Sequence, residues 1–364
     1  MKTISQELKE LFAGKAEYLL LNGDCLCLLK DFPSESINCV ITSPPYWNQR
    51  EYDFNIINMP QNHVPIGEES DYRDYTANLL AIFTEIKRVL KKDGAFWLNL
   101  GDKYYNKNLL GMPWRVALAM QEDGWILRND IIWDQMKGTQ SAKDRFRDIY
   151  EHIFYFVKSK KYYYDHDKIR IKPNTRAKNV NGTMISATGV SGIKYRQQIM
   201  DSEALSNTEK KNALEALEET IEEMKRGEVI DFRMTIRGQQ RIYHSDDKKI
   251  SGRANDLKKN GFFILKMKSN GYLPSDIWRI VPEDKWRKDA HYAVFPEDLL
   301  LNPILATCPE NGIVLDPFSG IGSTVAAAIK LGRKGIGIEL SNHYHNIAKT
   351  RMEQETEKYR LFSL

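Results

Sequence analysis

The chain has 364 residues, 42% of them hydrophobic, which is enough for one large or two ordinary domains. Its net charge of +4 permits a nucleic-acid partner without requiring one, so the distribution of charge matters more than the sum. No run of about 18 apolar residues is present, and the N-terminus has no apolar export segment. We therefore expect a soluble protein of the cytoplasm with no membrane contact.

The cysteines do not form a pattern typical of metal or disulfide sites. The chain contains four of them, with no C-x-x-C pair and no histidine cluster at ligand spacing: Cys25, Cys27, Cys39 and Cys308. We expect free thiols, as in a reducing cytoplasm, and no metal.

The first predicted element is a short buried strand at 17–22, which ends at Gly23-Asp24. An acidic side chain at this point suits contact with a ribose or an adenine amino group, but a turn-forming aspartate is an equal alternative. A short helix is expected at 25–30.

The next strand, which begins near Cys39, ends in Thr42-Ser43-Pro44-Pro45-Tyr46. Two prolines cannot continue a sheet, so the strand must stop in a stiff turn. Ligands of open α/β sheets bind at the carboxyl ends of the strands. A planar base would stack on Tyr46, and Ser43 and the Pro44 carbonyl would accept hydrogen bonds from its amino group. The alternative is a Pro-Pro turn with a core tyrosine.

A long polar loop at 48–70 directly follows this turn. Helical spacing then predicts a helix at 71–92, a buried strand at 95–100 and a helix at 112–122 that begins with Pro113. The apolar runs 125–133 and 150–157 follow each other without a helix between them, which predicts an antiparallel pair of strands.

The character of the chain changes at Lys158. Residues 158–200 are rich in lysine, arginine and tyrosine and show no regular period, which favours contact with a phosphate backbone over a solvated insertion. A charged helix or helical hairpin is expected at 201–227. A second basic cluster follows, of the residue types that read guanine and adenine edges: Arg233, Arg237, Gln239, Gln240, Arg241, Tyr243, His244 and Arg253.

Regular structure resumes near residue 276, with a helix expected up to Ala306. Residues 311–340 then predict a strand, a glycine turn, a helix and a second strand. In this βαβ unit, Gly320 and Gly322 let the backbone approach a ligand, and Glu339 ends the second strand, where an acid can hold ribose hydroxyls. A buried glycine turn without a ligand is the alternative. A last helix is expected at 342–359.

Together, Asp316-Pro-Phe-Ser-Gly-Ile-Gly-Ser323 with Glu339 and Thr42-Ser-Pro-Pro-Tyr46 resemble the β class of S-adenosylmethionine-dependent amino-group DNA methyltransferases. The resemblance covers residues 18–157 and 276–350. It implies an α/β fold with a Rossmann-like, seven-stranded, mostly parallel sheet that contains one antiparallel strand. The strand at 313–316 should lie beside the strand that carries Ser43.

The resemblance also implies a division of the chain and of the site. Residues 1–157 and 291–364 would form the catalytic domain, and 158–290 would form an inserted target-recognition region. Ser43, Pro44 and Tyr46 would grip a flipped base, with Pro45 fixing the turn. The positions expected to bind S-adenosylmethionine are Asp24, His291, Phe295, Asp316, Phe318, Ser319, Gly320, Gly322, Ser323 and Glu339.

Serine before Pro-Pro-Tyr is more frequent in the N4-cytosine enzymes that the chain resembles, so methylation of N4 of cytosine is the expected reaction. N6 of adenine is the alternative. The absence of a Pro-Cys dipeptide excludes a ring-carbon cytosine methylase. Rival interpretations are a nicotinamide-dependent oxidoreductase, a catalytically silent DNA-binding relative, and methylation of a protein glutamine or an RNA base.

The expected partner is double-stranded DNA, which must release its target base from the duplex. The resemblance also suggests a cognate restriction endonuclease in the same system, and a monomer or homodimer.

Overall fold

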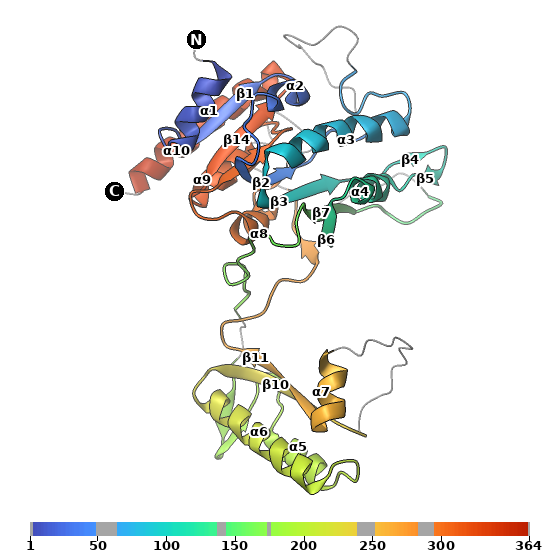
Figure 1. The fold of residues 1–364 in the computed structure, drawn as a ribbon, viewed down its shortest axis with the longest axis vertical. Coiled ribbons are helices and arrows are strands. Elements are labelled where there is room, and N and C mark those ends of the chain that lie inside the picture. The colour runs from blue at the N-terminus through green and yellow to red at the C-terminus, as the bar shows by residue number, and fades with distance from the viewer. Residues whose placement is uncertain are drawn as a thin grey trace. The chain divides into compact units, whose positions relative to one another are not determined.

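The computed structural model describes residues 3–48, 64–136, 143–172, 176–238, 252–282 and 295–362 (Figure 1). The chain divides into two compact units. The sheet unit comprises Met1–Ile169 and Ser275–Leu364, and the insert unit comprises Arg170–Pro274.

The limits of the insert unit differ from the expected 158–290. Residues 158–169 belong to the sheet unit because their backbone is bonded to it: Tyr163 N donates to Asp93 O (2.9 Å) and Asp165 N donates to Ala306 O (2.8 Å). Residues from Ser275 onward also belong to the sheet unit, because they supply a strand to its sheet.

The sheet unit alternates strands and helices, as an α/β fold requires. Its first half contains α1 (Ile4–Phe12), β1 (Tyr18–Asn22), α2 (Cys25–Leu29), β2 (Ile37–Thr42), α3 (Tyr72–Val89), β3 (Leu90–Leu100), β4 (Tyr104–Tyr105), β5 (Asn108–Leu109), α4 (Met112–Glu122), β6 (Ile126–Asp134) and β7 (Tyr150–Val157). Its second half contains β12 (Ile277–Arg279), α8 (Asp298–Thr307), β13 (Ile313–Asp316), α9 (Ser323–Lys330), β14 (Lys334–Glu339) and α10 (Asn342–Phe362).

The central sheet has the order β1-β14-β13-β2-β3-β7-β6-β12. All neighbours pair in parallel except at β7, which is antiparallel to both β3 and β6. The α/β class, the mostly parallel sheet and its one antiparallel strand are therefore confirmed. The expected number of strands was seven, and the described residues form eight, because the three-residue strand β12 extends the edge beside β6.

Helices cover both faces of this sheet (Figure 1). On one face, Val40, Phe96 and Leu315 form a core with side chains of α1, α2, α3 and α4. On the other face, Ile41 and Trp97 pack against α8 and α9. The predicted neighbourhood of β13 and β2 is confirmed by the pairs Val314–Cys39 and Leu315–Val40.

The sequence predicted most of these elements within a few residues. Two differences have local causes. The helix expected at 71–92 ends at Val89, because Leu90 is extended and pairs with Ile37 across a bulge at the start of β3. The helix α1 was not predicted, although Thr3 and Gln6 form a capping box at its start.

The insert unit contains β8 (Lys178–Val180), β9 (Thr183–Ile185), α5 (Gly192–Met200), α6 (Asn207–Lys225), β10 (Val229–Ile236), α7 (Gly252–Asn260) and β11 (Phe262–Lys268). The antiparallel pair β10–β11 packs on α6 through a core that includes Leu217, Phe232 and Met234. The expected helix is confirmed as α6, ended by Gly227 in a left-handed conformation (φ 77°). The segment expected to be irregular also contains β8, β9 and α5.

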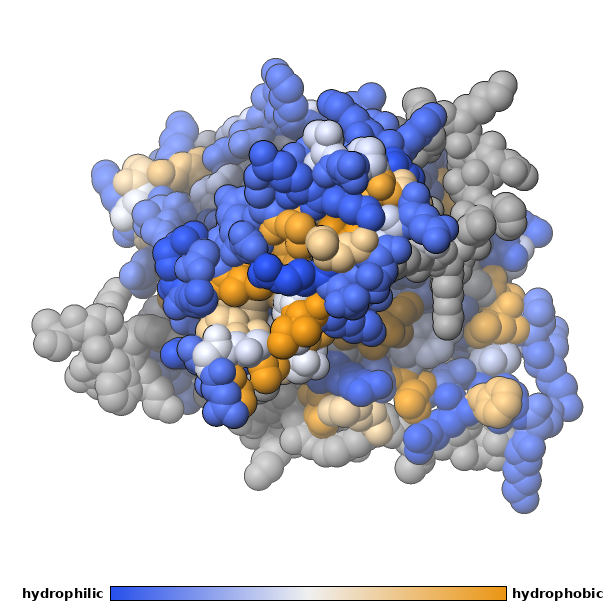
Figure 2. Space-filling model, turned by 90° about the horizontal axis from the view of Figure 1, so that it is seen from below, coloured by the Kyte–Doolittle hydropathy of each residue, from blue (hydrophilic) through white to orange (hydrophobic). Residues whose placement is uncertain are grey.

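The surface seen from below in Figure 1 is mainly hydrophilic, with smaller groups of hydrophobic side chains between the charged ones (Figure 2). Among the helices that the structure describes, none combines the length and apolar character needed to cross a membrane.

Candidate active site

The Ser-Pro-Pro-Tyr turn and the glycine turn meet at the carboxyl edge of β2 and β13. Thr42 is the last residue of β2, and its Oγ1 donates a hydrogen bond of 2.6 Å to Oδ1 of Asp316, the last residue of β13. This bond joins residues 274 positions apart in the sequence. Ser43 therefore begins its turn directly beside the start of the glycine turn.

Asp316 is a buried carboxylate whose two oxygens are both bonded within the protein. Oδ1 also accepts from the backbone N of Phe318 (3.0 Å), and Oδ2 accepts from Thr324 Oγ1 (2.6 Å). Burial raises the pKa of Asp316 to about 6, and these hydrogen bonds oppose that rise. In this structure Asp316 fixes the geometry where β2, β13 and α9 meet.

The glycine turn is closed by Glu339, which ends β14 next to β13. Oε2 of Glu339 accepts from Gly320 N (2.8 Å), and Oε1 accepts from Ser341 N (2.7 Å). Burial raises the pKa of Glu339 to about 7, against the effect of these two backbone donors. Because each carboxylate oxygen has two lone pairs, Glu339 retains acceptor capacity for a ligand.

The turn also leaves room and an unused polar group at this edge. Gly320 has φ 52°, and a Cβ placed on it would meet no atom within 4 Å. Within the described part of the chain, the buried Oγ of Ser319 has no hydrogen-bond partner. Phe318 is partly buried and packs on the core. No side chain of the described residues caps the N-terminus of α9 at Gly322, so its amides suit an anionic group.

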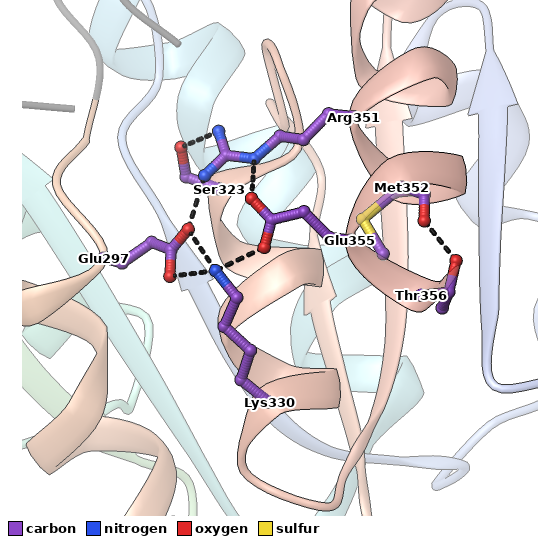
Figure 3. A network of polar contacts seen from close by, with 7 residues as sticks. All are labelled: Glu297, Ser323, Lys330, Arg351, Met352, Glu355 and Thr356. Carbon is purple, nitrogen blue, oxygen red and sulfur yellow. Dashed lines mark hydrogen bonds and ion pairs between the residues drawn. The ribbon is translucent and has the colours of Figure 1, made fainter. Parts of the chain in front are cut away.

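Ser323 faces a different set of groups. It is buried, and its Oγ accepts from Arg351 Nη1 (3.1 Å) in an ionic network of α8, α9 and α10 (Figure 3). Its side chain therefore supports the turn from behind, and the expected contact of Ser323 with the cofactor stays a prediction.

Three further residues were expected to bind the cofactor: Asp24, Phe295 and His291. Asp24 follows β1, beside Glu339, and caps α2 by accepting from Cys27 N (2.9 Å). Phe295 packs near Trp133 in the core on the α8 face of the sheet. His291 lies outside the described residues.

Tyr46 is the centre of the hydrogen-bond network in the Ser-Pro-Pro-Tyr turn. Its hydroxyl lies 2.6 Å from Glu151 Oε2, 3.0 Å from Asn99 Oδ1 and 3.3 Å from Ser43 Oγ. Burial raises its pKa well above the usual value, and the charge of Glu151 adds to this effect. The phenol is therefore protonated at neutral pH.

Neighbouring segments hold the turn in place. Tyr75 of α3 donates to the Pro45 carbonyl (3.0 Å), and Trp47 Nε1 donates to Glu69 O (2.9 Å). The ring of Tyr46 lies against Gly101, where a Cβ would come within 2.6 Å of the ring. Among the described residues, no donor is bonded to the carbonyl oxygen of Pro44, which leaves it available to a ligand.

Four polar residues of this site were not found from the sequence: Thr42, Asn99, Glu151 and Thr324. Polar residues at the ends of apolar strands were the available signal for Asn99 and Glu151. Among the described residues, no group of three or more His, Cys, Asp or Glu side chains could hold a metal ion.

Comparison with known proteins identifies the family. The family model described as DNA methylase, of the N6/N4 type, matches residues 37–350. The chain belongs to this DNA methylase family. This methylase is 30% identical over 389 aligned positions to the Type II methyltransferase M.SfiI of Streptomyces fimbriatus, covering 90% of this chain and 89% of the relative. It is 27% identical to M.Cfr9I of Citrobacter freundii, covering 92% and 88%.

Among solved structures, the methylase resembles the cytosine-N4-specific PvuII DNA methyltransferase with a TM-score of 0.56 and 18% identity, over 95% of this chain and 92% of the other. This likeness concerns the fold. The methylase uses S-adenosylmethionine as its methyl donor. Three features fit that cofactor: the open space at Gly320, the Ser319 hydroxyl, which has no partner among the described residues, and the remaining acceptor capacity of Glu339.

Proposed function

We propose that this methylase methylates N4 of a flipped cytosine in double-stranded DNA. The observation that carries the proposal is the position of Ser43, directly after Thr42, which is bonded to Asp316 at the start of the glycine turn. A base amino group held at Ser43 would lie beside a cofactor held at that turn. The cytosine-N4-specific enzyme with a similar fold is consistent with this choice.

The proposed roles follow from the chemistry of an exocyclic amine. Its lone pair is delocalised into the ring, so it is a poor nucleophile. The Ser43 hydroxyl and the Pro44 carbonyl would accept hydrogen bonds from the two N–H groups of this amine, which would turn its lone pair toward the methyl group. Tyr46 would stack on the base, and Pro45 would keep the turn stiff. Positioning then supplies most of the rate enhancement.

Bound S-adenosylmethionine supplies an activated methyl group. Glu339 would hold its ribose hydroxyls, Phe318 would pack against it, and the backbone at Ser319, Gly320 and Gly322 would line its path. Asp316 and Ser323 would act mainly by fixing this turn, as their hydrogen bonds indicate.

For target recognition we propose the insert unit, Arg170–Pro274. It contains 20 lysines and arginines against 13 aspartates and glutamates, a net charge of +7, whereas the whole chain has +4. Six of these acids lie on α6, so the rest of the unit is more strongly basic, as phosphate contacts require. The Type II names of the relatives support a partner restriction endonuclease in the same system.

Single-molecule sequencing of DNA from a host that expresses the methylase tests the proposed base. We expect N4-methylcytosine at one recurring sequence, and none of it in a host that expresses Tyr46→Ala. Modified adenine at a recurring sequence, with unmodified cytosine, would refute the cytosine assignment and leave the family and cofactor standing.

A further inference from the structure

After methylation, the amine nitrogen must release one proton, and the described side chains indicate which group accepts it. The nitrogen lone pair forms the new N–C bond, and the broken methyl–sulfur bond leaves its electron pair on sulfur. The nitrogen must then release one hydrogen as a proton. Ser43, which would face that hydrogen, is a neutral hydroxyl and cannot keep an extra proton at neutral pH.

We propose that Ser43, Tyr46 and Glu151 form a proton relay that carries this proton to the carboxylate of Glu151. The inference rests on the function proposed above and assigns a role to Glu151, which lies at the start of β7. The proton of the amine passes to Ser43 Oγ, the hydroxyl proton of Ser43 passes to Tyr46 Oη, and the phenol proton passes to Glu151 Oε2. Both hydroxyls end neutral, and Glu151 later releases its proton to water.

The distances support this direction of transfer. Ser43 Oγ lies 3.3 Å from Tyr46 Oη, and Tyr46 Oη lies 2.6 Å from Glu151 Oε2. The phenol has one hydrogen, and the second distance is typical of a hydroxyl bonded to a carboxylate. The contact of 3.0 Å with Asn99 Oδ1 is longer, and an amide oxygen is a poor proton acceptor. The phenol hydrogen therefore points to Glu151.

The surroundings fix the relay in this arrangement. Gln135, directly after β6, donates from Nε2 to Glu151 Oε1 (2.9 Å), which leaves Oε2 directed at Tyr46. Burial and the nearby charge of Glu151 raise the pKa of Tyr46, so the phenol carries a proton onward and does not store negative charge. Gly101 lets the Tyr46 ring approach closely, which limits movement of the hydroxyl.

The variant Glu151→Gln separates proton transfer from positioning. Glutamine has the same shape and still accepts from Tyr46, and the amide of Gln135 can turn to offer its oxygen to the new amide. We expect the single-turnover rate at saturating S-adenosylmethionine and DNA to fall about 10²-fold, within the range of general-base catalysis. Tyr46→Phe, which keeps the stacking ring, should show a similar loss, and the double variant should lose little more.

Two binding measurements on the same variants complete the test. The dissociation constant for S-adenosylmethionine, from calorimetry, and extrusion of the target base, from a fluorescent base analogue at the mapped site, should stay within about twofold of wild type. Asp130→Asn is the matched control, because this carboxylate on the neighbouring β6 is bonded to His152 (2.9 Å). It should keep the wild-type rate.

The outcomes separate the relay from the proposed function. If wild type methylates cytosine and Glu151→Gln is equally fast, Glu151 only positions Tyr46 and the relay is wrong. If the slower single-turnover rate of Glu151→Gln is explained by weaker binding of S-adenosylmethionine or by loss of base extrusion, the relay is also wrong. If wild type forms no N4-methylcytosine, the proposed function fails independently of the variants.

Discussion

Glu339 carries the clearest dependence on pH among the residues of the site. Its pKa is raised to about 7 by burial, so the carboxyl binds protons in the folded protein at pH values where an exposed glutamate has lost them. Ribose hydroxyls donate hydrogen bonds and therefore favour the ionised form. With the ribose held at Glu339 as proposed above, we expect cofactor binding to be coupled to deprotonation of this carboxyl.

We predict that affinity for S-adenosylmethionine rises between pH 6 and pH 8, by up to about tenfold for each pH unit below the pKa of Glu339. Calorimetry across this range in two buffers of different ionisation enthalpy will measure both the affinity and the proton released. In Glu339→Gln the pH dependence should shrink, and what remains belongs to the cofactor. An unchanged dependence in the variant would contradict the role of Glu339.

The same shift affects stability with a definite sign. Because the folded pKa of Glu339 lies above the ordinary value near 4.5, the folded protein binds more protons between these two values. The free energy of unfolding of the cofactor-free protein therefore falls as pH rises from about 4.5 to 7. Asp316, with its pKa raised to about 6, contributes in the same direction. Urea unfolding at several pH values will show this slope, and bound cofactor should reduce it.

At the scale of elements, a network of buried and partly buried charged side chains joins α8, α9 and α10 behind the glycine turn (Figure 3). Arg351 of α10 is fully buried and reaches Glu297 Oε1, before α8, at 2.6 Å. Lys330 of α9 pairs with Glu297 (2.7 Å) and with Glu355. The network ends at Ser323, the first residue of α9.

We predict that Arg351→Met lowers the free energy of unfolding by about 3 kcal/mol, because it leaves the buried carboxylate of Glu355 and the partly buried carboxylate of Glu297 with one cation fewer. Urea unfolding measures this change. The matched control is Lys225→Met, which removes an ion pair with Glu222 whose side chains are 48% and 55% exposed, and it should change stability by less than about 1 kcal/mol. Equal effects of the two variants would contradict a structural role for the network.

The sequence predicted the strands and helices whose signals are local. Gly23 and Gly320 marked strand ends, and Pro113 marked the start of α4. The pair β10–β11 was missed because α7 and a long connection separate its strands, so no short turn joins two alternating runs. The network of Arg351 was missed because two of its partners, Glu297 and Ser323, come from other parts of the chain, and only tertiary packing brings them to α10.

In the site, too, local sequence motifs were predicted and contacts made by tertiary packing were not. The motifs predicted Ser43, Tyr46 and Glu339 and the edge of the sheet where they lie. They did not predict that Thr42 joins the two turns or that Glu151 meets Tyr46, because these contacts depend on strand order and register. A polar Glu151 next to the apolar run 153–157 was the sign that a strand end contributes to the site.

At the scale of the whole molecule, the two compact units predict two separate functions, with target recognition in the insert unit and methyl transfer in the sheet unit. We predict that replacing Arg170–Pro274 by the corresponding segment of a relative with another recognition sequence moves DNA specificity to that of the relative. Affinity for S-adenosylmethionine should stay within about twofold, because the described residues that we propose for cofactor binding all lie in the sheet unit. Sequencing of DNA modified by the chimera measures its specificity. An active chimera with the original specificity would refute the assignment.

We propose above all that the Ser-Pro-Pro-Tyr turn and the glycine turn, which Glu339 closes, form one site for methyl transfer to a base amino group. The most direct test is to incubate the purified methylase with unmodified DNA and S-adenosylmethionine, digest the DNA to nucleosides and identify the product by mass spectrometry. We predict N4-methyldeoxycytidine from wild type, and about 10²-fold slower formation of it by Ser43→Ala, which lacks the acceptor for the amine. N6-methyldeoxyadenosine as the sole product would contradict the target base, and an equally fast Ser43→Ala would contradict the site.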